Sequence, residues 1–122
     1  MTATEVKNVL GGKLESCCFD PQTGFYRDGY CNTDKFDRGR HIVCAVMTDE
    51  FLLFSKQHGN DLITPRHSYD FPGLNAGDKW CLCVLRWRQA LENNVAPKVI
   101  LASCHAKCLD YVSLKTLQEY AY

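Results

Sequence analysis

The sequence lacks several of the patterns that assign a function directly. No stretch approaches the ~18 apolar residues that a membrane-spanning helix needs. Basic and acidic residues number 14 each, which excludes the broad positive field that non-specific nucleic-acid binding requires. No Gly-rich phosphate loop, Ser nucleophile elbow or paired-carboxylate motif is present. We therefore expect a protein with no nucleic-acid partner, no membrane partner and no nucleotide cofactor.

A secretory signal is also missing, because the first residues contain neither an apolar core nor a small-residue cleavage site. The predicted location is therefore the reducing cytoplasm. In that compartment, the eight cysteines are expected to be free buried thiols, or metal-binding or catalytic residues, rather than a disulfide framework. Their spacing lacks the paired C-x2-C knuckles that make a zinc site easy to recognise.

The chain has the size and composition of one globular domain. Its 122 residues are 46% hydrophobic and 23% charged, which is enough apolar material for a core without cross-links. We expect a single domain over 1–122, with its core between about residues 8 and 120. A monomer or small homo-oligomer is the expected state.

Two strand-then-helix units form the clearest structural pattern. In the first, the apolar run 41–47 predicts a buried strand, Thr48 is placed to cap a helix, and Gly59 is placed to end it. In the second, the apolar run 80–85 predicts a strand, and apolar spacing up to Asn94 predicts an amphipathic helix.

The remaining segments complete an α+β prediction. We expect short strands at 8–15 and 98–102, a short helix capped by Ser103, and a last helix from Ser113 to Tyr120. The predicted fold is a small central sheet of three to four short strands with about four short helices and two long ordered loops. The loops cover 17–40 and 60–78.

The first loop is the main candidate for a site, because long structureless loops in compact domains are usually functional. Arg27 is suited to bind a carboxylate or phosphate, and Asp28 to act as a base or to orient a histidine. Cys31 is the candidate nucleophile, and His41 and His105 are candidate acid-base groups. The alternative is that Arg27 and Asp28 only hold a turn.

Four further residues are candidate ligand-binding groups. Asn32 belongs to the first loop, while Asn60 and Asp61 extend the site from the second, unless they form an Asx-turn. Arg86 follows a strand, and ligands collect at the carboxyl ends of strands if those strands are parallel. Together with Arg27, these residues predict a pocket for a small anionic ligand between the two loops.

The cysteines allow a second kind of site. Cys81 and Cys83 share one face of their predicted strand, so they are either two small core residues or a thiolate pair. Cys31 and Cys44 are able to join them in a zinc site, to which His41 and His105 are further candidate ligands. The spacing alone does not decide between these alternatives.

Several ordered motifs carry a family resemblance over about residues 8–112. They are N-V-L-G-G from Asn8, D-P-x-T-G-F-x-R-D-G-x-C-N-T from Asp20, H-x-V-C-A-V-M-T from His41, G-N-D-L from Gly59, F-P-G-L from Phe71 and G-D-x-W-C-L-C from Gly77. With these motifs the chain resembles a domain-of-unknown-function family of small bacterial and plant proteins.

The resemblance implies no activity, but it sorts the cysteines. It implies that Cys17, Cys31, Cys44, Cys81 and Cys83 stand at cysteine positions of the family, and His105 at a histidine position. Cys18, Cys104 and Cys108 depart from the pattern.

Two functions are therefore expected from the sequence. One is a small cytosolic enzyme or ligand-binding protein with an anion-accepting pocket. The alternative is a non-catalytic protein-interaction module, with or without a structural metal. It is favoured by loop aromatics of the kind enriched at interface hot spots, namely Phe19, Phe25, Tyr26, Tyr30 and Phe36.

Overall fold

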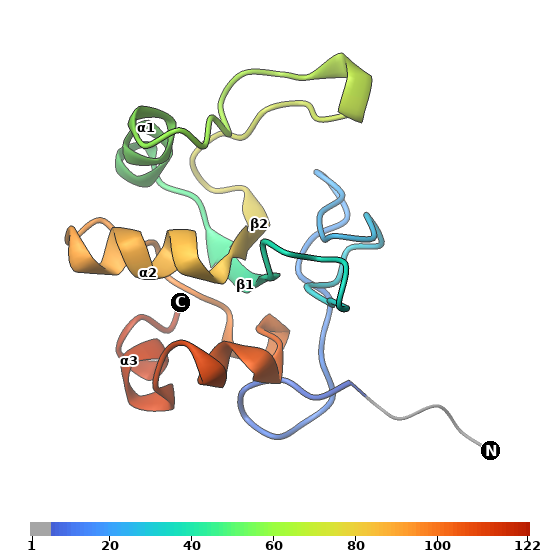
Figure 1. Ribbon diagram of the computed structural model, residues 1–122, viewed down its shortest axis with the longest axis vertical. Coiled ribbons are helices and arrows are strands. Elements are labelled where there is room, and N and C mark those ends of the chain that lie inside the picture. Colours follow the sequence, from blue (N-terminus) through green and yellow to red (C-terminus); the bar gives the residue numbers. More distant parts are fainter. Residues whose placement is uncertain (1–5) are drawn as a thin grey trace.

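A two-stranded antiparallel sheet lies at the centre of the computed structural model, which describes residues 6–122 (Figure 1). Strand β1 (His41–Val46) pairs with β2 (Lys79–Cys83), and the central residues of both strands are buried. Cys44 stands opposite Cys81 and His41 opposite Cys83, with an irregularity in register between His41 and Val43. Such bulges bend a strand and re-aim the side chains beside them.

Both predicted strand-then-helix units are confirmed. Helix α1 (Asp49–Gln57) begins after Thr48, whose Oγ1 accepts a hydrogen bond from the Phe51 N–H at 3.0 Å. Helix α2 (Val84–Glu92) follows β2 directly and buries Trp87, whose Nε1 donates to the Pro97 carbonyl at 3.0 Å. In Figure 1 both helices lie to the left of the strands, and residues 17–40 lie to the right.

The prediction of further strands is wrong for the described residues. Segment 98–102 makes only single bridges, from Val99 to Ala45 and to Ala121, because the backbone then turns into the 3-10 helix η2 (Leu101–Ser103). Segment 8–15 likewise makes only isolated bridges. The sheet therefore has two strands rather than three or four, although the α+β class stands.

The helices after residue 100 are short. A 3-10 helix, η3 (Ala106–Asp110), takes the place of the helix expected after Ser103. Helix α3 (Leu114–Glu119) begins as predicted at Ser113, whose Oγ accepts from the Thr116 N–H at 3.2 Å. The other 3-10 turn, η1 (His67–Tyr69), interrupts the loop 60–78.

The expectation that all cysteines are free is wrong for four of them. Loop 17–40 has no helix or strand and is cross-linked to the sheet by two disulfides, Cys17–Cys44 to β1 and Cys31–Cys81 to β2. Free thiols were expected only because the predicted compartment is reducing. Which cysteines form disulfides depends instead on which segments the fold brings together. The four free cysteines are Cys18, Cys83, Cys104 and Cys108.

Cys104 and Cys108 are buried core thiols that bond the backbone of β1. Both are fully buried, and their Sγ atoms donate to the backbone carbonyls of Cys44 and Ile42 in β1. The hydrogen bond with Cys104, together with burial, raises the pKa of Cys108 far above its ordinary value. These two thiols therefore attach the C-terminal segment to the sheet.

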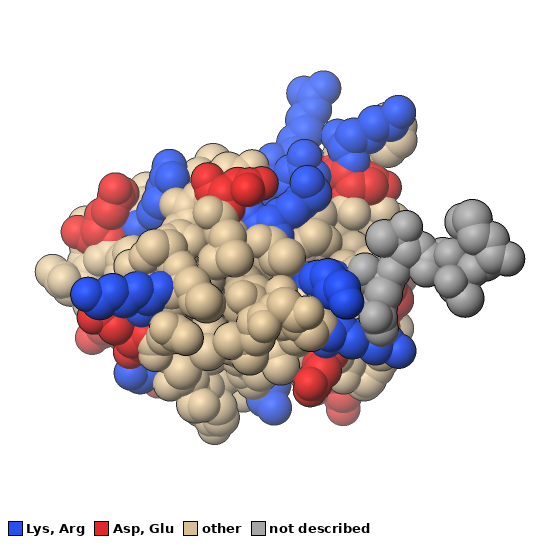
Figure 2. Space-filling view, turned by 90° about the horizontal axis from the view of Figure 1, so that it is seen from below, with Lys and Arg blue, Asp and Glu red and all other residues tan. Residues whose placement is uncertain are grey.

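Charge is distributed without a dominant sign. On the face in Figure 2, basic and acidic side chains both lie around the margin, and the centre carries few of either. Among residues 6–122, no helix is long and apolar enough to cross a membrane.

Candidate active site

A pocket of about 670 Å³ lies between the loops 17–40 and 60–78 and reaches the ends of both strands. Three arginines line it, Arg27, Arg66 and Arg86, and among residues 6–122 Asp61 is the one acidic residue that does so. Its apolar wall consists of Phe25, Leu62, Tyr69, Phe71, Trp80 and Leu82. Basic and acidic residues balance over the whole chain, at 14 each, so the excess of arginine over acidic groups is local to the pocket.

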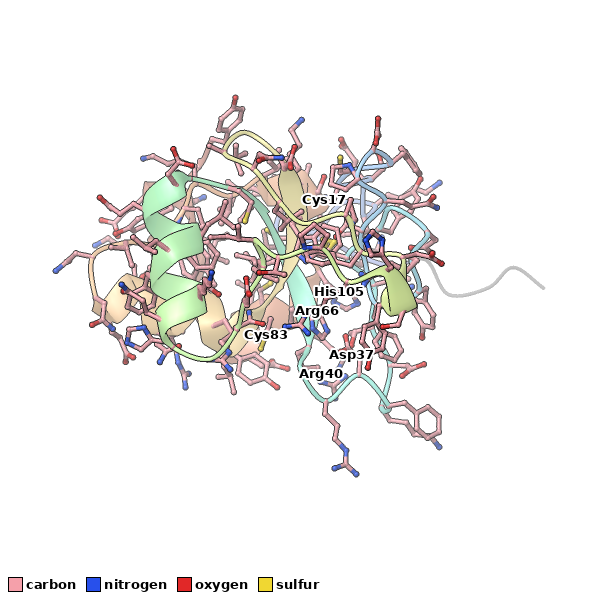
Figure 3. The ribbon with its side chains drawn as sticks, turned by 90° about the horizontal axis from the view of Figure 1, so that it is seen from above. Cys17, Asp37, Arg40, Arg66, Cys83 and His105 are labelled. Atoms are coloured by element: carbon pink, nitrogen blue, oxygen red, sulfur yellow. A yellow bond between two sulfur atoms is a disulfide. The ribbon has the colours of Figure 1, made fainter. Side chains whose placement is uncertain are left out.

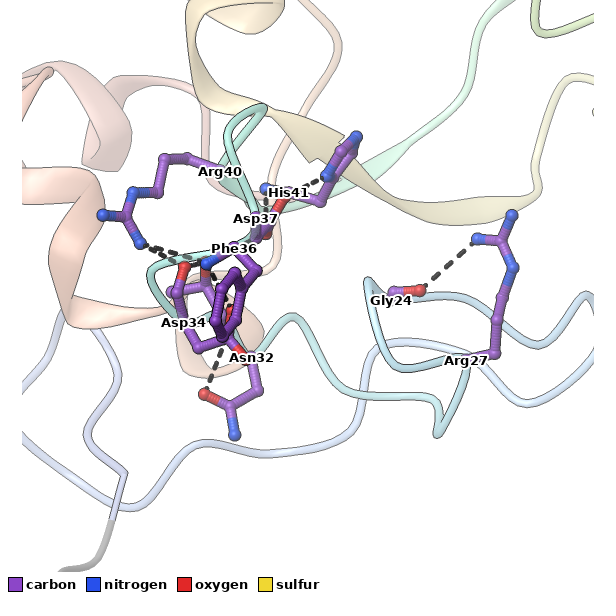
Figure 4. Close-up of polar contacts among 9 residues, drawn as sticks. Gly24, Arg27, Asn32, Asp34, Phe36, Asp37, Arg40 and His41 are labelled. Atoms are coloured by element: carbon purple, nitrogen blue, oxygen red, sulfur yellow. Dashed lines mark hydrogen bonds and ion pairs between the residues drawn. The ribbon is translucent and has the colours of Figure 1, made fainter.

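Arg27 is held over an aromatic wall. Its guanidinium carbon lies 5.0 Å from the Trp80 ring centroid, and Nη1 donates to the Gly24 carbonyl at 3.4 Å (Figure 4). Gly24 has φ +102°, and a Cβ there would lie 2.3 Å from the Tyr30 carbonyl oxygen. The turn that places Arg27 therefore requires glycine at position 24.

The other two arginines come from different elements. Arg86, in the first turn of α2, donates from Nη1 to the His58 carbonyl at 2.9 Å. Arg66 is exposed, but its backbone exchanges hydrogen bonds with that of Phe71 at 2.8 and 3.0 Å. Since a guanidinium carries five N–H donors, each arginine retains donors for a ligand.

His41 is oriented by Asp37, a buried carboxylate. His41 Nδ1 lies 2.7 Å from Asp37 Oδ1, while Asp37 Oδ2 accepts from the His41 N–H at 3.0 Å and from Thr33 Oγ1 at 2.9 Å (Figure 4). The Asp37 side chain is 0% exposed and the His41 side chain 42%. A carboxylate only accepts, so Nδ1 carries the shared proton and Nε2 remains available.

Cys83 stands opposite His41 in the strand register, and both residues line the pocket. Cys83 is a free, half-buried thiol at the end of β2 and occupies the N-cap position of α2. The amino end of a helix carries a partial positive charge that favours an anion. Gly39 leaves room for the imidazole, since a Cβ there would lie 2.7 Å from His41 Cε1.

Asp61 lines the pocket but serves its own loop. Its carboxylate accepts from Thr64 Oγ1 at 2.6 Å, from the Thr64 N–H at 3.1 Å and from the Ile63 N–H at 2.9 Å. These bonds, the Thr64 hydroxyl first, lower the pKa of Asp61 to about 2. The side chain therefore makes the Asx-type turn that the sequence left open, and its charge is fixed.

A family model matches residues 7–121, and its description reads "Uncharacterized protein conserved in bacteria (DUF2237)". The chain belongs to this family. The resemblance inferred from the sequence motifs is thereby confirmed. The family description names no reaction or ligand for the pocket described above. No curated protein is significantly similar to the chain.

In this DUF2237 chain, five of the nine candidate catalytic and ligand-binding residues lie at the pocket, and four do not. The five are Arg27, His41, Asn60, Asp61 and Arg86. Arg86 was expected at the pocket because the carboxyl ends of parallel strands share one edge of a sheet, but the two strands are antiparallel. Arg86 lines the pocket from the first turn of α2, directly after β2.

Of the four outside, Asp28 and Asn32 accept hydrogen bonds from the N–H groups of Tyr30 and Thr33 and shape the loop. Cys31 is fully buried and disulfide-bonded, which excludes it as a nucleophile in this state. His105 caps η3, its Nδ1 accepting from the Lys107 N–H at 3.0 Å, and burial, then Lys107 and Arg40, lowers its pKa.

Sequence reasoning did not single out Asp37 or Arg66, and it left Cys83 open as a core residue, one half of a thiolate pair with Cys81, or a metal ligand. Cys83 and Arg66, both labelled in Figure 3, line the pocket from β2 and from the second loop. No motif marks Asp37, because its role depends on burial and on the return of the chain to His41. Its spacing of four residues before a histidine at a strand start was the one available signal.

Proposed function

We propose that the protein is a cysteine-dependent enzyme acting on a small anionic substrate. Cys83 is the nucleophile, His41 the acid-base group, and Asp37 the positioning residue that orients His41. The observation that carries this proposal is that Cys83 and His41 are paired across the two strands and both line a pocket with three arginines. A nucleophile, a base and an orienting acid are the recurring parts of cysteine-based active sites.

The proposed chemistry is nucleophilic group transfer. His41 Nε2 accepts the proton of the Cys83 thiol as Sγ bonds to an electrophilic centre of the substrate. The leaving group departs with its bonding electron pair and takes the proton from His41. A second nucleophile, such as water, then gives a proton to His41 and bonds to the transferred group, while the bond to Sγ breaks and its electron pair stays on sulfur. His41 returns the proton to Sγ, which restores the thiol.

The pocket supports recognition of an anion attached to an apolar or planar body. The three arginines provide bidentate donors for a carboxylate or phosphate, and the aromatic wall provides a surface for the remainder. The volume of about 670 Å³ is typical of small-molecule sites. We propose the reducing cytoplasm as the location, where Cys83 remains a thiol and the four cysteines of the two disulfides are reduced as well.

Cysteine alkylation tests the proposal without knowledge of the substrate. The protein is treated with iodoacetate or with neutral iodoacetamide, and the modified peptides are quantified by mass spectrometry. Cys18 is the control inside the same chain, because it is also a free, half-buried thiol but does not line the pocket. We expect Cys83 to react faster than Cys18 and to favour iodoacetate over iodoacetamide by about tenfold relative to Cys18, or ~1.4 kcal/mol.

Matched variants separate the nucleophile from the anion site. His41→Gln and Asp37→Asn should slow the reaction of Cys83 with both reagents, whereas Arg27→Gln and Arg86→Gln should reduce only the preference for iodoacetate. Arg88→Gln is the control on α2, since Arg88 bonds the Tyr111 carbonyl outside the pocket. Equal reactivity of Cys83 and Cys18, with no preference for the anionic reagent, would contradict the proposal.

A protein-interaction function is the second candidate, because loop 17–40 exposes several large aromatic side chains. Phe36 is 72% exposed and Phe19 59%, while Phe25, Tyr26 and Tyr30 are 36–46% exposed. Clustered aromatics of this kind are enriched at interfaces. If this candidate holds, Phe36→Ser should abolish any concentration-dependent association measured by light scattering without changing Cys83 alkylation.

A further inference from the structure

Four buried cysteines lie near one another, and one of them, Cys81, lines the pocket. The Sγ atoms of Cys17, Cys31 and Cys81 all lie within 4.8 Å of one another, and Cys44 is bonded to Cys17. The exposed fraction is 7% for Cys17, 1% for Cys81, and 0% for the other two residues. The two disulfides are therefore neighbours in a single cluster of four sulfur atoms, which we call the sulfur cluster.

The sulfur cluster draws its members from four separate places in the chain. Cys17 and Cys31 come from the irregular loop, and Cys44 and Cys81 are directly opposed residues of β1 and β2. Two disulfides that only cross-link the loop have no need to approach each other. Here the Sγ atoms of Cys17, Cys31 and Cys81 lie within 4.8 Å of one another, while Cys44 lies outside that group and joins it through its bond to Cys17. Tetrahedral zinc with bonds of about 2.3 Å separates its sulfur ligands by about 3.8 Å, so three of the four sulfur atoms are already close to the spacing of a metal site.

We propose that, in its reduced state, the sulfur cluster binds one zinc ion through Cys17, Cys31, Cys44 and Cys81. The site is closed, with four thiolate ligands and no position for substrate, so it is structural rather than catalytic. It differs from the metal set considered from the sequence, because Cys17 takes the place of Cys83. Cys83 stays free for the pocket, so the zinc site does not depend on the proposed enzyme function.

The disulfide and zinc states are related by a balanced exchange. Two equivalents of a dithiol reductant supply four electrons and four protons, which convert the two disulfides to four thiols and leave two oxidised dithiols. Zinc binding then releases the four thiol protons and gives a tetrathiolate centre. Oxidation by two equivalents of a peroxide reverses the change, forms two disulfides, reduces the peroxide to water or alcohol, and releases the zinc.

Metal analysis tests the site. Untagged protein is produced in zinc-supplemented cells, purified under a non-chelating reductant, and analysed for zinc by mass spectrometry and for total thiols after denaturation with chelator. We expect about one zinc per chain and all eight thiols. Peroxide treatment should release the zinc and lower the thiol count to the four free cysteines. Cobalt added to reduced, zinc-free protein should give the visible absorption of a tetrahedral cobalt–thiolate centre.

Variants and alternative outcomes keep this inference separate from the enzyme proposal. Cys83→Ser and Cys18→Ser should retain about one zinc, whereas Cys31→Ser should lose it. The cobalt spectrum of the unmodified protein serves as evidence if Cys31→Ser fails to fold. Reduced, folded protein with no zinc and no cobalt–thiolate absorption would overturn the site, as would a thiol count of four that resists the reductant.

Discussion

Asp61 lines an arginine-rich pocket, yet its carboxylate is committed to the loop that carries it. Three donors from Thr64 and Ile63 hold the charged form, which is why the pKa of Asp61 falls to about 2. A group so fixed does not move protons near neutral pH. Its role in the pocket is to keep residues 61–64 in one conformation and to contribute a negative charge among the arginines.

Removal of the Thr64 hydroxyl tests this assignment. Thr64→Val should raise the pKa of Asp61 from about 2 towards its ordinary value of 3.8, because the hydroxyl is the largest cause of the shift. The pKa is measured by an NMR pH titration of the carboxyl carbon. Thr64→Ser keeps a hydroxyl and should leave the titration unchanged. An unshifted pKa in Thr64→Val would contradict the assignment.

The lowered pKa of Asp61 also predicts how the stability of the fold changes in acid. The folded-state pKa of Asp61 is below its unfolded value, so the carboxylate contributes stability that is fully present above pH 3.8 and is lost as pH falls through about 2. Thr64→Val should therefore flatten the stability loss in this acid window. Urea unfolding at several pH values measures it.

At the scale of elements, capping signals predicted helix starts at Thr48 and Ser113 but not at Ser103, whose Oγ instead donates to the Ser16 carbonyl at 2.7 Å. Thr48 and Ser113 each cap a helix where the sequence placed one, because a side-chain oxygen three residues before a free N–H is a local device. No comparable local interaction determines whether the apolar run 98–102 forms a strand, because a strand needs a partner elsewhere in the chain. Val99 is the one fully buried residue of this run and alone forms bridges, to Ala45 of β1 and to Ala121 near the C-terminus.

The contribution of the Thr48 cap to stability can be measured by substitution. Thr48 is exposed, so replacing it removes the hydrogen bond to the Phe51 N–H without removing contacts in the core. Thr48→Ala should lower the free energy of unfolding by about 1 kcal/mol, and Thr48→Ser should cost much less because it keeps the hydroxyl. Urea denaturation monitored by circular dichroism measures both. Equal losses in the two variants would show that the cap bond is not what stabilises α1.

At the scale of the whole molecule, the pocket depends on a loop without regular secondary structure. The sulfur cluster joins this loop to both strands, and Thr23, which is fully buried, joins it to β2 through a 2.8 Å bond from the Cys81 N–H. Sequence reasoning placed Arg27 and His41 near one site because turn chemistry and strand starts are local. It did not find the disulfides, because contacts between segments distant in the chain leave no local pattern. It did not find Asp37, because the burial of that carboxylate, four residues before His41, is set by the fold.

The sulfur cluster should therefore control the order of the pocket. In reduced, zinc-free protein, we expect faster hydrogen exchange in loop 17–40, including the Cys17 and Gly29 amides, which bond the Gly29 and Thr23 carbonyls at 2.7 and 2.9 Å. Helix α2 should change much less, because its contacts with the core include the buried Trp87 and do not pass through the loop. Hydrogen-exchange mass spectrometry compares three states of the protein: oxidised, reduced with zinc, and reduced without zinc.

Loss of order in loop 17–40 should also change the reactivity of Cys83. Arg27 belongs to the loop and lies over Trp80, so release of the loop should weaken the preference of Cys83 for iodoacetate while Cys18 keeps its ratio between the two reagents. Restoring either the disulfides or the metal should return both the slow exchange and the anion preference. If exchange instead rises equally in the loop and in α2, the sulfur cluster stabilises the whole fold rather than the pocket wall, and the link between cluster and pocket is wrong.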